Sequence, residues 1–231
     1  MYSTAYSLVE EGGQVGNFWT YDFVRADPTK GIIIRNVKGQ EIPISQGLNA
    51  DKVIFGNGLP KATLGLTNTF KYGNFDFTLF LRGAWGHKII NEFRIFYENA
   101  NSGSLKSYNR VLTKYWDANI KDATYTTYHI EKGDFIRLDN FTLGYNLPLS
   151  NGGIFNKMRV FLSGNNIATI TGYTGINPEL RFVDGNTDDD GNGSSLNPKF
   201  YRTGNAFAPG IERRSSYFTS RSFTLGAHFG F

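Results

Sequence analysis

Hydrophobic and polar residues alternate strictly over the last nine positions of the chain. A period of two places the two kinds of residue on opposite faces of a β-strand. The pattern therefore predicts a strand with one apolar face, which suits either a buried strand of a soluble β-sandwich or a lipid-facing strand of a membrane barrel. The apolar face comprises Phe223, Leu225, Ala227, Phe229 and Phe231.

The same alternation predicts a hairpin earlier in the chain. Apolar residues recur at every second position of 62–72 and again of 75–85. Between them stands Gly73-Asn74, a dipeptide suited to a tight turn. Charged residues fall on one face only, so each strand is again apolar on one side and polar on the other.

Three further segments complete a set of six predicted strands. In 136–147 the alternation changes phase between Leu138 and Phe141, so we expect a β-bulge near Asp139-Asn140. Segment 158–163 alternates regularly, and Phe18 to Val24 does so less cleanly. The six strands have about the length that a tilted membrane strand needs.

The connections between these strands are of two kinds. Two are short, and they fall at one end of the sheet when strands are counted back from the last one. The long connections all fall at the other end, as the extracellular loops of outer-membrane barrels do. Because the smallest membrane barrels have about eight strands, we expect an all-β arc of a larger transmembrane β-barrel. The short connections are 73–74 and 148–153, and the long ones 26–60, 86–133 and 169–219.

Composition and charge exclude several other classes of structure and partner. Aromatic residues make up 16% of the chain. Cysteine is absent, and its absence excludes disulfides and thiolate metal sites. No run approaches the ~20 apolar residues of a membrane helix. The net charge of +4 is small and scattered, so we expect no nucleic acid as a partner. The first residues lack the features of a signal peptide, so we expect a fragment whose true N-terminus lies upstream.

Five motifs occur in order along the chain. They are Gly58-Leu-Pro-Lys-Ala-Thr-Leu-Gly65 with Tyr72-Gly-Asn-Phe-Asp-Phe77, Gly133-Asp-Phe-Ile-Arg-Leu-Asp-Asn-Phe-Thr-Leu-Gly-Tyr-Asn-Leu-Pro148, Arg159-Val-Phe-Leu-Ser-Gly-Asn-Asn166, Gly172-Tyr-Thr-Gly-Ile-Asn-Pro-Glu179 and Arg221-Ser-Phe-Thr-Leu-Gly226. A looser match covers 15–23 and 27–31. From about residue 10 to its end, the chain resembles the SusC/RagA-like TonB-dependent outer-membrane transporters.

The resemblance implies that residues 1–231 are the C-terminal part of a barrel of about 22 strands. Its N-terminal plug and TonB motif would lie outside this chain, and its long extracellular loops would carry short helices. The implied setting is the outer membrane of a Gram-negative bacterium, of the Bacteroidota, and the implied cargo is an oligosaccharide or a peptide. The implied partners are a SusD-like surface lipoprotein, the TonB complex and outer-membrane lipid. A passive porin-like barrel without TonB coupling and a soluble β-rich carbohydrate-binding module are the alternatives.

The end of the chain resembles the signal that the barrel-assembly machinery reads. The signal orders a polar residue, a glycine and two aromatic residues along the closing strand. We therefore expect the last strand to descend to the periplasm and to carry this signal on Thr224, Gly226, Phe229 and Phe231.

No catalytic arrangement is found, so we expect that the protein is not an enzyme. His87, His129 and His228 are far apart in sequence, and His228 is expected on the lumen wall. Serine residues lack a nucleophile-elbow context, and no glycine-rich phosphate loop is present. We expect no metal, catalytic or cofactor site outside one acidic stretch.

That acidic stretch imitates the first half of a calcium loop. Asn186, Asp188 and Asp190 recur at every second position before Gly191, as oxygen ligands do in such loops. The glutamate expected near the end is replaced by Asn197. The loop 186–197 is therefore either a hydrated extracellular loop, which we favour, or a calcium site.

Aromatic and charged residues supply the remaining candidates. The spacing of apolar residues predicts helices near 89–97 and 105–116. Aromatic side chains around them either form a small satellite core or contact the lid lipoprotein or sugar rings. The candidates for contact with the lid or a substrate are Trp19, Trp116 and Tyr173, and those on the lumen wall are Asp76, Arg82, Arg137 and Arg159.

Overall fold

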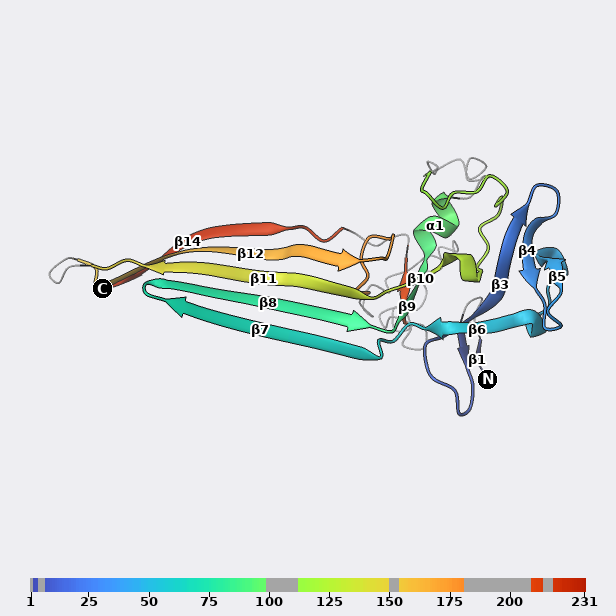
Figure 1. The fold of residues 1–231 in the computed structure, drawn as a ribbon, viewed down its shortest axis with the longest axis horizontal. Coiled ribbons are helices and arrows are strands. Elements are labelled where there is room, and N and C mark those ends of the chain that lie inside the picture. The colour runs from blue at the N-terminus through green and yellow to red at the C-terminus, as the bar shows by residue number, and fades with distance from the viewer. Residues whose placement is uncertain (1, 4–6, 99–111, 150–153, 181–208, 214–217) are drawn as a thin grey trace, which may run out of the picture. The chain divides into compact units, whose positions relative to one another are not determined.

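The computed structural model describes residues 2–3, 7–98, 112–149, 154–180, 209–213 and 218–231. The chain divides into two compact units. The first, here called the loop unit, comprises Met1–Pro60, Gly86–Gly133 and Tyr173–Tyr217. The second, the sheet unit, comprises Lys61–Trp85, Asp134–Gly172 and Phe218–Phe231. Figure 1 shows the elements of both.

The sheet unit is a five-stranded antiparallel sheet in the order β14-β12-β11-β8-β7 (Figure 1). Five of the six predicted strands are therefore confirmed as neighbours in one sheet. β7 and β8 have 11 residues each, enough to cross a bilayer when tilted. The strands are β7 (Ala62–Tyr72), β8 (Phe75–Trp85), β11 (Phe135–Asn146), β12 (Lys157–Thr171) and β14 (Ser222–Gly230).

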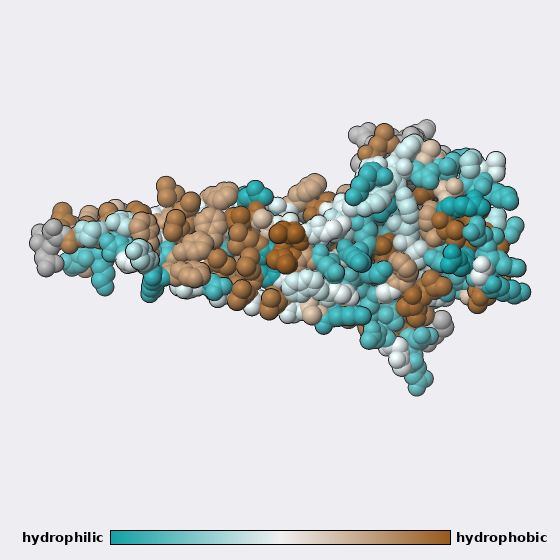
Figure 2. Space-filling model, viewed as in Figure 1, coloured by the Kyte–Doolittle hydropathy of each residue, from teal (hydrophilic) through white to brown (hydrophobic). Residues whose placement is uncertain are grey.

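The register aligns apolar residues in rows that run across all five strands. In one row, each residue is the register partner of the next, and four of its five members are at least 38% exposed. Figure 2 shows hydrophobic residues gathered over much of this sheet. No described residue of the sheet unit covers this face. The row is Phe70, Phe77, Leu143, Leu162 and Leu225.

The neighbouring row lies on the opposite face and consists only of hydroxyl residues. Its members are again register partners, and the Oγ1 atoms of Thr69 and Thr78 lie 3.3 Å apart. The sheet is thus apolar on one face and polar on the other, as the alternation predicted. This row is Thr69, Thr78, Thr142, Ser163 and Thr224.

The predicted β-bulge is confirmed. The register of β11 shifts between Leu138 and Asn140 against both of its neighbours, β8 and β12. Because one extra residue is inserted there, Leu138 lies on the same face as Phe141 although three positions separate them.

The two ends of the sheet differ in their connections. At one end, β7 and β8 are joined by Gly73-Asn74, where Gly73 has a φ of 56°. The Lys157–Gly230 pair places the chain end beside the short β11–β12 connection at that same end. The long connections that follow β8 and β12 leave from the other end, as predicted for periplasmic turns and extracellular loops.

The predicted strand Phe18 to Val24 exists but does not join the five-stranded sheet. It is part of β3 (Asn17–Asp27), which pairs with β2, β4 and β6 in the loop unit. The two-residue period reports that Phe18 and Thr20 are buried on one side, but it does not specify which strands lie beside them. The predicted connection 26–60 is consequently filled by β4 (Gly31–Arg35), β5 (Glu41–Pro43), β6 (Lys52–Asn57) and the 3₁₀ helices Ile44–Gln46 and Asn49–Asp51.

The rest of the loop unit contains short elements around a small core. β9 (Lys88–Asn91) lies between β10 (Ile130–Lys132) and β13 (Ile211–Glu212), and β9 leads into α1 (Glu92–Tyr97). The other described elements of this unit are β1 (Tyr2–Ser3), β2 (Ser7–Val9) and the 3₁₀ helix Thr127–His129. Two apolar clusters form the core, namely Phe18, Ile90, Ile95 and Ile130, and Ile32, Ile34 and Ile120.

The helix predictions for 86–133 are only partly confirmed. The stretch predicted at 89–97 is a strand followed by the short helix α1. Of 105–116, residues 112–116 contain no helix, and the remainder lies outside the described residues. Among the described residues, no helix has the length and apolar character needed to cross a membrane.

A charge on the apolar face should weaken folding into a bilayer far more than the same charge on the polar face. We expect Leu79→Arg in the full-length protein to lower the free energy of unfolding by about 2–4 kcal/mol, because the guanidinium would enter hydrocarbon. The matched variant Thr78→Arg faces the lumen and should change it by less than about 1 kcal/mol. Urea titration in lipid vesicles measures both, and equal losses would contradict the assignment of faces.

Candidate functional site

The polar face of the sheet carries a bidentate ion pair between two strands, β12 and β8, that are separated by β11. Nε of Arg159 donates to Oδ1 of Asp76 at 3.0 Å, and its Nη2 donates to Oδ2 at 2.5 Å. The side chain reaches from β12 across β11 to β8. Gly144 of β11 makes this possible, because a Cβ there would lie 2.3 Å from the guanidinium. Two predicted lumen-wall residues are thus brought together.

A flat aromatic surface lies beside this pair. The ring of Phe161 sits over Gly226, where a Cβ would come within 2.5 Å of it. His228 stacks on Phe161 with ring centroids 5.0 Å apart and planes inclined by 21°. His228 therefore lies on the polar face, as the alternation predicted, and its neighbours there are an aromatic ring and Arg159.

The other two lumen-wall candidates, Arg82 and Arg137, are register partners in a single row nearer the other end of the sheet. Arg82 forms an ion pair with Asp139, the residue at the bulge, with Nε and Oδ2 3.0 Å apart. Arg137 stands opposite Arg82 in the register and donates from Nε to Oγ1 of Thr169 at 2.9 Å. The bulge thus supplies the carboxylate that offsets one of two facing cations.

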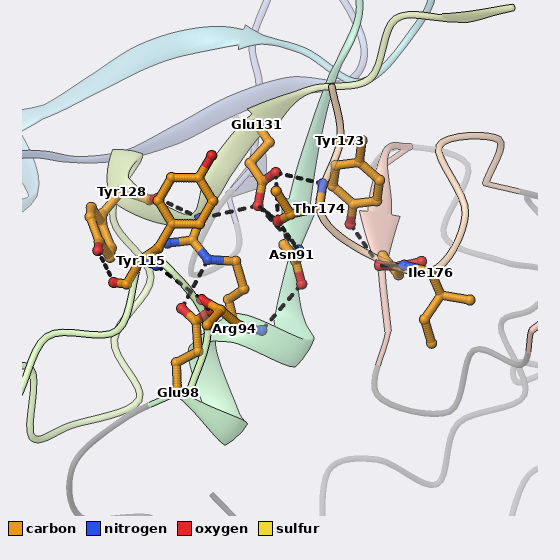
Figure 3. Close-up of polar contacts among 11 residues, drawn as sticks. Asn91, Arg94, Glu98, Tyr115, Tyr128, Glu131, Tyr173, Thr174 and Ile176 are labelled. Atoms are coloured by element: carbon orange, nitrogen blue, oxygen red, sulfur yellow. Dashed lines mark hydrogen bonds and ion pairs between the residues drawn. The ribbon is translucent and has the colours of Figure 1, made fainter. Parts of the chain in front are cut away.

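A buried polar cluster lies in the loop unit, centred on Arg94 of α1 (Figure 3). Arg94 is 5% exposed; its Nε donates to Glu98 at 2.9 Å and its Nη1 to Glu131 at 3.0 Å. Burial disfavours its charge, but the carboxylates of Glu98 and Glu131 outweigh burial and raise the pKa of Arg94. The guanidinium also lies between the rings of Tyr115 and Tyr128, 4.4 and 4.9 Å from their centroids.

The motif that begins at Gly172 folds around two carboxylates. Glu131 accepts hydrogen bonds from the backbone N–H and the hydroxyl of Thr174, at 2.9 and 2.8 Å. Glu212 accepts from the hydroxyl of Tyr173 at 2.7 Å. Burial raises the pKa of Glu212, and burial together with the Glu212 carboxylate raises the pKa of Tyr173. Glu131, Glu212 and Arg94 were not among the residues predicted from the sequence.

The three aromatic candidates have different surroundings within the loop unit. Trp19 is half-buried on β3, with Nζ of Lys52 4.4 Å from its ring centroid. Trp116 is half-buried in the connection that precedes β10. Tyr173 is only 6% exposed and binds Glu212, so it offers little surface to a substrate or a lid.

The remaining chemical candidates have simple outcomes. The described residues contain no group of three or more histidine, cysteine or acidic side chains that could hold a metal ion. The candidate calcium loop 186–197 lies outside them. His129 is 2% exposed, and burial lowers its pKa to about 3, so the ring stays neutral at physiological pH.

Comparison with known proteins finds relatives in the class that the sequence motifs resemble, the TonB-dependent receptors. No family model matches the chain. It is 27% identical over 177 residues to TonB-dependent receptor P3 of Formosa agariphila, covering 71% of this chain and 17% of that protein. It is also 27% identical to TonB-dependent receptor SusC of Bacteroides thetaiotaomicron, over 58% of this chain and 14% of SusC. The chain therefore spans less than a fifth of the length of these relatives.

A solved structure extends the comparison to nearly the whole chain. The fold matches the RagAB peptide importer in its closed-closed state with a TM-score of 0.68, covering 99% of this chain and 24% of that one at 17% identity. The fold is thus similar to a section of this importer, as the relatives named TonB-dependent receptors would predict, and the described strands do not close a barrel. The predicted resemblance to SusC/RagA-like transporters and the predicted outer-membrane setting are confirmed. Relatives named as receptors also fit the expectation of a protein that is not an enzyme.

Enlarging Gly144 should break the ion pair on the polar face. In Gly144→Ala the new Cβ would displace Arg159 from Asp76, and we expect a loss of about 1 kcal/mol of folding free energy. Asp76→Asn should then add little in the Gly144→Ala background, because the pair is already broken. Urea titration of the single and double variants in vesicles measures the coupling.

Gly172→Ala is the matched control, since nothing lies within 4 Å of a Cβ at that position. Additive effects of Gly144→Ala and Asp76→Asn would show that Gly144 does not serve this ion pair.

Proposed function

We propose that this chain is the C-terminal barrel section of a transporter that takes up a large nutrient across the outer membrane, driven by TonB. The observation that carries the proposal is the two-faced sheet, combined with the resemblance of its motifs to TonB-dependent receptors. Its exposed apolar rows suit contact with lipid, and its polar rows suit the wall of a water-filled lumen.

The polar wall is suited to the passage of a large polar cargo. Two of its arginines, Arg82 and Arg159, are each matched by a carboxylate on the same wall. Hydroxyl groups fill one of the two rows between these ion pairs, and the other row contains Phe80 and Asn140. Such a wall can exchange hydrogen bonds with an oligosaccharide or a peptide without presenting a large unbalanced charge.

The proposed partners follow from the class of protein. A SusD-like lipoprotein would cover the extracellular side, where the long connections begin, and the TonB complex would act through a plug outside this chain. RagAB is described as a peptide importer, which supports a peptide cargo as one of the two options. An oligosaccharide is the other.

Energy coupling is the direct test of this function. In cells that express the full-length protein, uptake of a labelled oligosaccharide or peptide mixture should cease when TonB is deleted, and should return on complementation. A SusD-like lipoprotein should co-purify from the same cells. Uptake that persists without TonB would instead indicate the passive porin-like barrel.

The end of the last strand should determine assembly. Phe231 is 83% exposed and, with Phe229, packs against Phe155. We propose that Thr224, Gly226, Phe229 and Phe231 are read by the barrel-assembly machinery. Deleting Phe231 from the full-length protein should reduce the amount in the outer membrane severalfold by quantitative immunoblotting. Phe218→Ala is the control for loss of an exposed aromatic residue, and normal insertion without Phe231 would contradict this role.

A further inference from the structure

Two carboxylates hold the short segment Tyr173–Asn177, and they come from different parts of the chain. Glu212 is fully buried and the side chain of Glu131 is 14% exposed. Glu131 belongs to β10, at the end of the connection that follows β8. Glu212 belongs to β13, which lies in the connection that follows β12. The segment is therefore held from two sides, and it begins just after Thr171, the last residue of β12.

Glu212 binds this segment through three donors. Its Oε2 accepts from the Tyr173 hydroxyl at 2.7 Å and from the backbone N–H of Ile176 at 3.0 Å. Its Oε1 accepts from the backbone N–H of Asn177 at 2.8 Å. Glu212 is fully buried, so losing the carboxylate would leave three donors without water to replace it. Gly175 lets the segment close, because a Cβ there would lie 1.9 Å from Oε2.

Glu131 connects the same segment to helix α1. One of its oxygens, Oε1, accepts from Thr174 Oγ1 at 2.8 Å, Arg94 Nη1 at 3.0 Å and Asn91 Nδ2 at 3.1 Å. Asn91 in turn caps α1, since its Oδ1 accepts from the backbone N–H of Arg94 at 3.1 Å. A continuous set of hydrogen bonds thus runs from the segment to the first turn of the helix (Figure 3).

Backbone pairing between β13 and β9 provides a second connection between Glu212 and the residues around α1. β13 pairs in parallel with β9, and the N–H of Ile90 donates to the carbonyl of Gly210 at 2.8 Å. Gly210 has a φ of +82° and packs against Gly58, where neither position has room for a Cβ. Glu212 is therefore fixed to β9 through its own strand while it holds Tyr173–Asn177.

We propose that Tyr173–Asn177, Glu131 and Glu212 form an interlock that makes the described parts of the two long connections move as one body. This inference rests on the proposed function, in which the long connections lie on the extracellular side, where cargo is captured. Under that function, the interlock is a positioning device: a displacement of the segment after β12 is transmitted to α1, and a displacement of α1 is transmitted back.

Hydrogen exchange in the full-length protein tests the interlock. Glu212→Gln keeps the size of the side chain but replaces one accepting oxygen with an NH₂ group. That group cannot accept a hydrogen bond from the donors that it would face. We expect amide exchange to increase about tenfold in 173–177 and, through Glu131, also in 92–97. Glu41→Gln is the matched control, since that carboxylate is 47% exposed and its variant should change neither region.

A second variant keeps the test decisive if Glu212→Gln does not fold. Gly175→Ala forces the segment away from Glu212 without removing a charge, and it should give the same paired increase. Faster exchange in 173–177 alone, with 92–97 unchanged, would overturn the interlock, as would no change in either region. Because exchange is measured on purified protein without cargo or TonB, failure here is distinct from failure of the proposed uptake.

Discussion

The register of the five-stranded sheet is the constraint on which the two faces of this structure depend. Phe70, Phe77, Leu143, Leu162 and Leu225 lie in one line across the strands, and the next line is made only of threonine and serine. A slip by one residue in any strand would exchange the two lines and place hydroxyl groups against lipid. The bulge at Asp139 is part of the same constraint, because it restores the phase of β11 after Leu138. In hydrocarbon every backbone N–H and C=O group must be paired, so the strands cannot separate to correct a wrong register. The register therefore determines which side chains lie on each face.

The ion pairs of the two units differ in how deeply they are buried. On the polar face of the sheet, Arg159 and Asp76 pair across the surface and remain partly open to solvent, with side chains 28% and 19% exposed. In the loop unit, Arg94 and Glu98 are about 5% exposed, and each hydrogen bond there replaces lost water. Removing one partner of a pair of the second kind destabilises the fold strongly, because the other partner becomes an uncompensated buried charge. This difference fits the proposed function, in which the polar face forms the wall of a lumen and the loop unit lies outside the membrane.

The extent to which the sequence predicts this structure follows from the range of each interaction. Five strands and the bulge at Asp139-Asn140 were predictable because each strand has one apolar face, which the two-residue period records locally. The position of Phe18 to Val24 in another sheet was not, since the period does not identify a strand's neighbours. Glu212 was missed because its partners are distant in sequence; Tyr173 is 39 residues away. Arg94 was missed because Glu131, which links it to the segment after β12, is 37 residues away, although Glu98 is only four. The motif at 172–179 marked the right segment, but not the two carboxylates around which it folds.

The central claim, that alternate residues of the sheet face lipid and water, can be measured directly on β11. The 231 residues contain no cysteine, so spin labels can be attached to single cysteines placed at Asn140, Phe141, Thr142 and Leu143 in the full-length protein in lipid vesicles, with any cysteine elsewhere replaced. Collision rates with oxygen, which concentrates in lipid, should be high at 141 and 143 and low at 140 and 142. Rates with a water-soluble nickel complex should show the reverse order. The absence of a two-residue alternation, or the opposite phase, would contradict the account.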